Sequence, residues 1–327
     1  MKIFYPFAKR FIAGHDFDSA KPKIQELMNE GYEVSVDYLG ELSTNVDDCE
    51  KATEQYIRII QYYWDKKIDI SIKPSQLGLL INPAISYRNL SRIAKLAEKY
   101  GHTVRLDMED SRVTELTRNQ AISLNKKYGN VGVAIQANLH RTEQDLKVLI
   151  EKKIPVRLVK GAYKESSDVA FQKESDIEDA FFGFAAMLRA EKLKKTAIAT
   201  HDEEVLEEIE DILPDPDFFD YEFLYGVRRD LQKSLLNKGY SVRIYVPFGK
   251  DWLPYTIRRL KEWKNLKFVI KNVFKEWWRW LIRNKCVCGV GLGCVGMCVL
   301  GENTIPEIIR RFMSKSSGTF ANKDVET

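Results

Sequence analysis

The sequence predicts an α/β fold, a (βα)8 barrel of the TIM type, and two observations support this. Apolar, β-branched runs alternate along the chain with segments whose apolar residues recur every three or four positions, as expected for strands and helices. Eight such runs are present, which is the number that closes a parallel barrel. A doubly wound open sheet is the alternative, but no Gly-x-Gly-x-x-Gly motif follows the first strand.

The predicted strands are rich in valine, isoleucine, tyrosine and threonine, the residues that favour sheets. In chain order they are the segments 32–39, 68–73, 103–107, 131–137, 155–160, 196–200, 221–226 and 241–246. A helical segment precedes the first strand, and helices connect the later ones. One of these helices, within 88–101, is closed by Gly101, because glycine readily adopts the left-handed conformation after a helix. We expect a barrel domain over residues 1–275 and a separate tail over residues 276–327.

The composition excludes several classes of protein. Hydrophobic residues make up 44% and charged residues 30% of the chain, which is too apolar for a disordered protein. A net charge of +4 is too small to predict nucleic-acid binding. The first residues lack the apolar core of a secretory signal, and the five cysteines do not form a disulfide framework for the barrel. These features favour a reducing, cytoplasmic location.

Polar residues occupy one face of several predicted strands, near the ends where barrel enzymes build their active sites. Strand alternation places Lys73, Asp107, Gln136, Arg157 and Tyr245 on the interior face. Any one of them is more commonly a solvated strand-end residue, but five of the same parity predict a pocket for an anionic ligand. Because buried cations need partners, Asp107 is the expected partner of Lys73.

A second cluster follows the eighth strand, in the segment 245–262. Pro254 suits the first turn of a helix on which Tyr255, Arg258 and Arg259 occupy adjacent parts of one face. An arginine pair forms a fork for a carboxylate or a phosphate, although a solvated basic helix explains an isolated pair equally well.

The sixth strand ends near Thr200 and His201, followed by Asp202 as a candidate helix cap. A lone histidine is more often structural than catalytic, but this one lies where a barrel strand meets its helix. The sequence contains no His-Glu-x-x-His motif, no zinc spacing, no P-loop and no serine nucleophile elbow. No metal site is therefore predicted.

The order of the motifs resembles the proline dehydrogenase family, in its monofunctional form and as a domain of bifunctional proline utilization proteins. The resemblance covers about residues 8–275 and rests on RFIAG, DYLGE, SIKPSQLG, RLDMEDS, IQANLHRTEQDL, VRLVKGAY, ATHD, LYGVR and YVPFGKDWLPYTIRRLKE. It implies a distorted barrel with FAD bound non-covalently across the C-terminal ends of the strands. It also implies oxidation of L-proline to Δ1-pyrroline-5-carboxylate, by hydride transfer from C5 to flavin N5.

The resemblance also assigns roles to residues of this chain. The implied catalytic residues are Asp107 and Arg157, with Arg157 near flavin N5. The implied substrate residues are Lys73, Tyr245, Tyr255, Arg258 and Arg259, the arginine pair holding the carboxylate. The implied cofactor contacts are Met108, Gln136, Arg157, Val159, Lys160, Gly161, Ala162, Thr200, His201 and Glu262. Glu41 is the implied gate, which pairs with one of the clamp arginines.

The sequence departs from the family pattern at two places in the barrel. The seventh strand is about two residues shorter than usual, and Lys164 stands where an aromatic residue commonly follows the KGAY motif. The implied partners are L-proline, a quinone or other membrane electron acceptor, and a separate pyrroline-5-carboxylate dehydrogenase that continues the route to glutamate.

The tail has no counterpart in the family. Its first part continues a basic, tryptophan-rich amphipathic pattern that is typical of a membrane-surface helix, although a helix covering the barrel is the alternative. Residues 286–300 are fifteen uncharged positions, too few for the roughly 20 of a membrane span. Peripheral contact with the inner face of the membrane therefore stays open. So does a different function, that of a non-catalytic ligand-binding barrel tethered by its tail.

Overall fold

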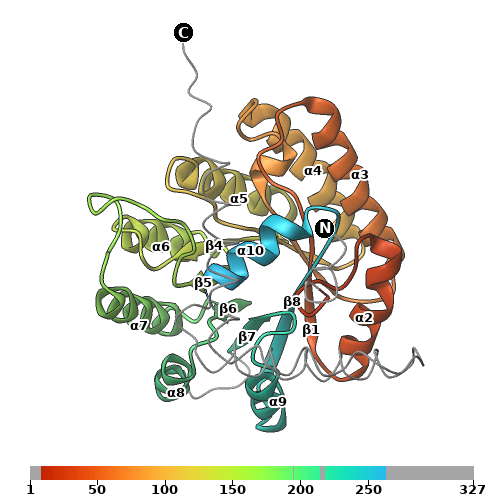
Figure 1. The fold of residues 1–327 in the computed structure, drawn as a ribbon. Helices are drawn as coiled ribbons and strands as arrows, with labels where there is room; N and C mark the ends of the chain where they lie inside the picture. Colours follow the sequence, from red (N-terminus) through yellow and green to blue (C-terminus); the bar gives the residue numbers. More distant parts are fainter. Residues whose placement is uncertain (1–8, 194, 214–217, 263–327) are drawn as a thin grey trace, which may run out of the picture. The chain divides into compact units, whose positions relative to one another are not determined.

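The computed structural model describes residues 9–193, 195–213 and 218–262, without the side chains of residues 258–262. Its parallel strands form a closed barrel in chain order, in which each strand pairs with the next and β8 pairs with β1 (Figure 1). The strands are β1 Glu33–Tyr38, β2 Asp69–Ile72, β3 Thr103–Leu106, β4 Val131–Gln136, β5 Val156–Val159, β6 Thr196–Ala199, β7 Phe219–Leu224 and β8 Ser241–Phe248. The predicted barrel is confirmed.

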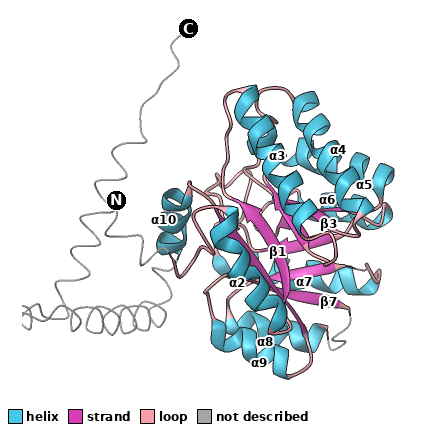
Figure 2. Cartoon of the chain, turned by 90° about the vertical axis from the view of Figure 1, so that its right-hand side faces the viewer, coloured by secondary structure: helices cyan, strands magenta, loops and turns pink. Residues whose placement is uncertain are grey.

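Helices surround the barrel in the part of the chain that is described (Figure 2). They are α2 Phe17–Asn29, α3 Val46–Tyr62, α4 Pro83–Lys99, α5 Thr114–Tyr128, α6 Thr142–Glu151, α7 Glu174–Ala190, α8 Glu203–Ile212, α9 Arg229–Asn237 and α10 Trp252–Glu262, with a short 3-10 helix at Pro74–Leu77. The helical segment expected before the first strand is α2. Gly101, with φ +72°, follows α4 as predicted.

Strand β7 runs over Phe219–Leu224, so it begins two residues before the predicted segment and is six residues long. It pairs in parallel with β6 and β8, with Glu222 opposite Ala199 and Arg243. The departure from the family pattern therefore leaves β7 paired on both sides.

The two faces of the strands differ in polarity. Alternate residues such as Val36, Ile70 and Leu158 are fully buried in the hydrophobic layer between the barrel and its helices. The intervening residues point into the barrel, and many of them are charged. Barrels of this type usually fill their interior with branched apolar side chains, whereas the interior of this barrel contains many charged ones.

The tail predicted over residues 276–327 lies outside the described residues. Within the residues that are described, no helix has the length and hydropathy needed to cross a membrane.

Candidate active site

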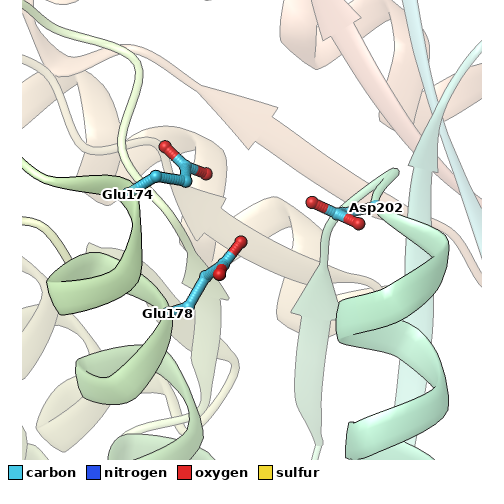
Figure 3. A group of neighbouring side chains, drawn as sticks. All are labelled: Glu174, Glu178 and Asp202. Atoms are coloured by element: carbon cyan, nitrogen blue, oxygen red, sulfur yellow. The ribbon is translucent and has the colours of Figure 1, made fainter.

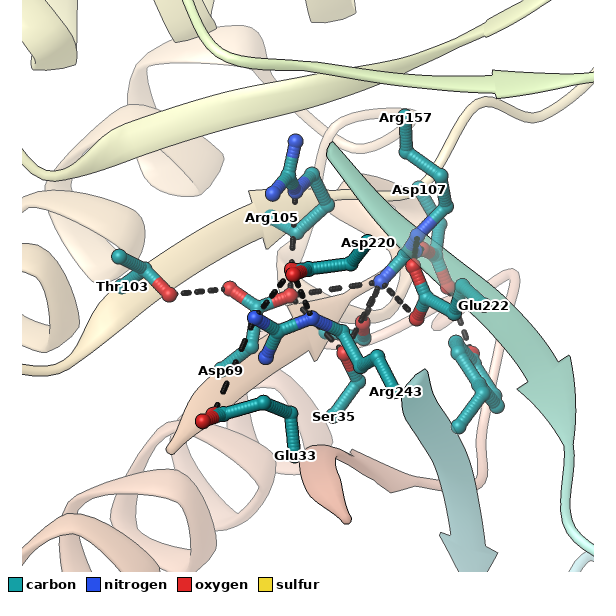
Figure 4. Close-up of polar contacts among 12 residues, drawn as sticks. Glu33, Ser35, Asp69, Thr103, Arg105, Asp107, Arg157, Asp220, Glu222 and Arg243 are labelled. Carbon is teal, nitrogen blue, oxygen red and sulfur yellow. Dashed lines mark hydrogen bonds and ion pairs between the residues drawn. The ribbon is translucent and has the colours of Figure 1, made fainter. Parts of the chain in front are cut away.

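The centre of the barrel interior is occupied by the guanidinium of Arg157, which is only 3% exposed (Figure 4). It makes a bidentate contact with Glu222 of β7, from Nε to Oε2 at 2.6 Å and from Nη2 to Oε1 at 2.8 Å. Nη1 donates to Asp107 Oδ1 at 2.6 Å, and Nη2 donates to Ser71 Oγ at 2.8 Å. Partners from β2, β7 and the end of β3 can meet only inside the barrel. Arg157 therefore lies on the interior face of its strand, as predicted.

A second group of polar side chains lies beside Arg157, towards the C-terminal ends of the strands. Lys73 Nζ lies 3.4 Å from Asp37 Oδ2, 3.5 Å from Asp107 Oδ2 and 3.3 Å from the hydroxyl of Tyr245. Tyr245 donates its hydroxyl to Asp107 Oδ2 at 2.7 Å, and its ring faces Arg157 at 5.3 Å. The predicted pairing of Lys73 with Asp107 is therefore present, and Asp37 is a second carboxylate that the pairing did not include.

The charges of this group depend on burial. Burial alone would lower the pKa of Lys73, but the carboxylates of Asp37 and Asp107 outweigh it and raise that pKa. Burial raises the pKa of Asp37, while Lys73 opposes the shift. Burial also raises the pKa of Tyr245 far above its usual value, and Asp107 adds to this. At neutral pH Lys73 is therefore a charged ammonium and Tyr245 a neutral phenol.

Apart from Arg157 in the barrel interior and Glu262 on α10, the residues predicted as cofactor contacts lie along one edge of the barrel, at the ends of β3 to β6. Gln136 ends β4 opposite Val159 of β5, and its amide donates to the carbonyl of Glu109 at 2.9 Å. Met108 and Thr200 are buried after β3 and β6. His201 Nε2 accepts a hydrogen bond from the Leu224 backbone N–H at 2.9 Å. The structure thus brings these predicted residues to neighbouring positions on one rim.

The turn after β5 depends on a glycine. Gly161 has φ +125°, and a Cβ atom at this position would lie 2.2 Å from the side-chain oxygen of Asn138. That oxygen is buried and has no hydrogen-bond partner among the described residues. Ala162 is exposed immediately after it. The positive φ and the close approach of the Asn138 side chain therefore explain why glycine is required here.

Lys160 has a different environment from the one expected of a cofactor contact. Its Nζ lies 2.8 Å from Glu174, 2.7 Å from Glu178 and 3.1 Å from Asp202. Figure 3 shows the three carboxylates facing one another, two from α7 and one from the start of α8. Asp202 was predicted to cap α8, but its side chain makes no capping hydrogen bond. The ammonium of Lys160 is the cation that these carboxylates share.

The remaining predicted residues belong to α10 and to the loop after β1. Tyr255 is buried on α10, and Glu41 is partly buried. Arg258, Arg259 and Glu262 also lie on α10, but their side chains are outside the described part of the chain. Their assignments as carboxylate clamp and cofactor contact stay predictions. So does the gate role of Glu41.

Sequence reasoning missed three carboxylates of the interior network, Asp37, Asp69 and Glu222. Each alternates with buried apolar neighbours within its strand, as Glu222 does between Tyr221 and Phe223. The same parity argument that identified Arg157 would have placed them inside.

Comparison with known proteins identifies the family of this chain. The family model described as Proline dehydrogenase matches residues 20–271. "Proline dehydrogenase 2" of Bacillus subtilis (strain 168) is 36% identical over 278 residues, which cover 82% of this chain and 91% of that protein. "Proline dehydrogenase" of Deinococcus radiodurans is 33% identical over 283 residues, which cover 82% and 90%.

A solved structure supports the fold. The crystal structure of proline utilization A from Bdellovibrio bacteriovorus, inactivated by N-propargylglycine, matches with a TM-score of 0.75 at 22% identity. The match covers 80% of this chain but only 33% of that longer protein. Motifs, barrel and sequence relatives agree, and the chain belongs to the proline dehydrogenase family.

Proposed function

We propose that this protein is an FAD-dependent dehydrogenase that oxidises L-proline to Δ1-pyrroline-5-carboxylate, the first step of proline catabolism. The observation that carries the proposal is the cluster of Lys73, Asp107, Tyr245 and Arg157 at the carboxyl end of the barrel, in a chain of this family. Asp107 and Lys73 keep 13% and 12% of their side chains exposed, so they are the members that a substrate above the cluster can touch.

The rim of β4, β5 and β6 fits a flavin nucleotide. Gly161 leaves its position free of a side chain, and the buried oxygen of Asn138 beside it lacks a hydrogen-bond partner in the described residues. An incoming hydroxyl or amide could donate to that oxygen. Gln136, Thr200 and His201 would contact the same nucleotide. Bound FAD would supply the redox chemistry by accepting a hydride.

The polar cluster prepares the amine of the substrate. A secondary ammonium must lose its proton before the neighbouring C–H bond can release a hydride, because the nitrogen lone pair forms the new C=N bond. Asp107 is the carboxylate of the cluster that stays partly exposed, at 13%, so it is the one placed to accept this proton from the substrate. Tyr245 and Tyr255 would exclude water above the cluster.

Arg157 would place a positive charge near the flavin that receives the hydride. Burial alone would lower the pKa of Arg157, but Glu222 and Asp107 raise it, so the guanidinium stays charged. A preorganised charge stabilises negative charge that develops during transfer without reorganisation. Lys160 would reach the cofactor only by leaving its three carboxylates.

The substrate carboxylate would bind to Arg258 and Arg259, with Glu41 closing the site. Electrons would pass to a quinone or another membrane acceptor, and a separate pyrroline-5-carboxylate dehydrogenase would use the product. These partners follow from the family resemblance. A cytoplasmic location with peripheral membrane contact would suit such an acceptor.

Purified full-length protein provides the test. It should be yellow from bound flavin, and the flavin absorption should bleach when L-proline is added without an acceptor. Pyrrolidine, which has the ring but no carboxylate, should bleach it poorly. A colourless protein that does not take up FAD, or a flavoprotein that proline leaves oxidised, would overturn the proposal.

A further inference from the structure

The N-terminal end of the barrel, opposite the candidate active site, holds a cavity of about 440 Å³. Its walls come from the first residues of β1, β3, β6, β7 and β8 and from the loops that precede them. In barrel enzymes this end contributes to stability, while the chemistry lies at the other end. The proposed function therefore gives the cavity no role.

Positive charge exceeds negative charge around this cavity. Two carboxylates line it, Glu33 and Asp220, and a third, Asp69, is buried beside it. Four cationic side chains line the same walls: Lys67, Arg105, Lys195 and Arg243. The surplus is one positive charge if all seven groups are ionised.

Two of these carboxylates already have close partners. Asp220 accepts from Arg243 Nε at 2.9 Å and Nη2 at 2.6 Å, and from Ser241 Oγ at 2.6 Å. Asp69 accepts from Thr103 at 2.5 Å and from Ser35 at 3.0 Å, as Figure 4 shows. The nearest approach of Asp69 to Arg105 is 3.8 Å, at Nε, which is too long for a hydrogen bond.

Arg105 is the cation left without adequate acceptors. It is 3% exposed, and among the described residues its one hydrogen bond runs from Nη2 to the carbonyl of Lys195 at 3.3 Å. Its Nε and Nη1 atoms are buried without a hydrogen-bond partner among the described residues. A buried donor without an acceptor is costly, and in native proteins it commonly marks an ion or a water molecule.

We propose that this cavity binds a small, singly charged carboxylate, with Arg105 as its main contact. The planar fork of a guanidinium matches a carboxylate, and one negative charge balances the surplus. Lys67 and Lys195 are exposed at the rim, where they would attract the anion from solution. The bound carboxylate stabilises the fold from the end of the barrel that does not carry the reaction.

Thermal unfolding of the full chain tests this, with chloride replaced by acetate at constant ionic strength. At ten times its dissociation constant, acetate should raise the Tm of the parent by about 3 °C. R105M should lose most of this shift. The matched control R112M, which removes an arginine whose side chain is 80% exposed, should keep it. Acetate bound at the substrate site would raise the Tm of the parent and R105M alike, so only the difference between them reports on the cavity.

Equal acetate-induced shifts in the parent and R105M would overturn the proposal. A larger shift with inorganic phosphate than with acetate would overturn the assignment of a singly charged carboxylate. Should R105M fail to fold, the double variant K67M/K195M replaces it, because both lysines are exposed. This variant should need several times more acetate for half of the shift, and an unchanged requirement would refute the site. None of these readouts depends on proline oxidation.

Discussion

Arg157 and Arg105 project into the same barrel from β5 and β3, and both are 3% exposed, yet their surroundings differ. Arg157 donates to two carboxylates at 2.6 Å and to Ser71 at 2.8 Å. Within the described part of the chain, Arg105 has one hydrogen bond, to a carbonyl at 3.3 Å. Carboxylates raise the pKa of Arg157, whereas burial lowers that of Arg105.

The comparison separates two uses of a buried cation. Desolvating a guanidinium costs several kcal/mol, and good geometry with carboxylates is needed to offset this. At the centre of the barrel Glu222 and Asp107 outweigh burial, so Arg157 stays charged. At the N-terminal end the offset is incomplete, which leaves Arg105 able to gain from a ligand. The following predictions test this difference, from the largest expected effect to the smallest.

Glu222→Ala should destabilise the protein most, by about 3–5 kcal/mol, because it leaves the buried charge of Arg157 without its bidentate partner. Glu222→Gln keeps an acceptor and should cost less. Urea unfolding with a common slope measures both free energies. A loss of about 1 kcal/mol or less, which is typical of an exposed ion pair, would contradict the view that Glu222 stabilises the buried charge of Arg157.

Asp69 should make stability depend on pH below about 4. Its cationic neighbours, Arg105 first, overcome burial and lower its pKa from 3.8 to about 2. A carboxylate with a lowered pKa contributes stability that is present above pH 4 and is lost as the pH falls towards 2, here about 2 kcal/mol. The parent and Asp69→Asn should therefore differ in unfolding free energy at pH 5 and converge near pH 2. A difference that stayed constant across this window would contradict the lowered pKa.

Tyr245→Phe removes the hydroxyl that donates to Asp107 and accepts from Lys73. If the proposed function holds, kcat for proline should fall about tenfold, equivalent to about 1.4 kcal/mol, with normal flavin content. Stopped-flow reduction of the flavin by proline measures the effect directly. An unchanged reduction rate would place the hydroxyl outside the reaction.

Arg105→Met should have the smallest effect in the absence of added anion, about 1 kcal/mol, because Arg243 and Arg157 remain to balance the carboxylate of Asp69. Flavin content and proline oxidation should be normal. Urea unfolding in a low-salt buffer without carboxylates measures the free energy. A loss as large as that of Glu222→Ala would show that the two guanidinium groups are equally well paired.

The sequence by itself determined the order of the elements and the side of each strand that faces inward. Eight apolar runs separated by helical patterns became eight strands, because the periods of two and 3.6 residues are local properties of the backbone. The same periodicity placed Lys73, Arg157 and Tyr245 inside, and a carboxylate near Lys73 could be expected because buried cations require partners.

Only the tertiary structure decided which interior residues meet. The alternation of residues along a strand does not tell which side chains lie close together across a barrel. It therefore could not predict that Arg157 on β5 pairs with Glu222 on β7, 65 positions later. Nor could it direct Lys160 to Glu174, Glu178 and Asp202, which helices α7 and α8 bring to it. Closure of the barrel fixes these pairs, and among the described residues closure also leaves Arg105 without a carboxylate close enough to accept a hydrogen bond from it.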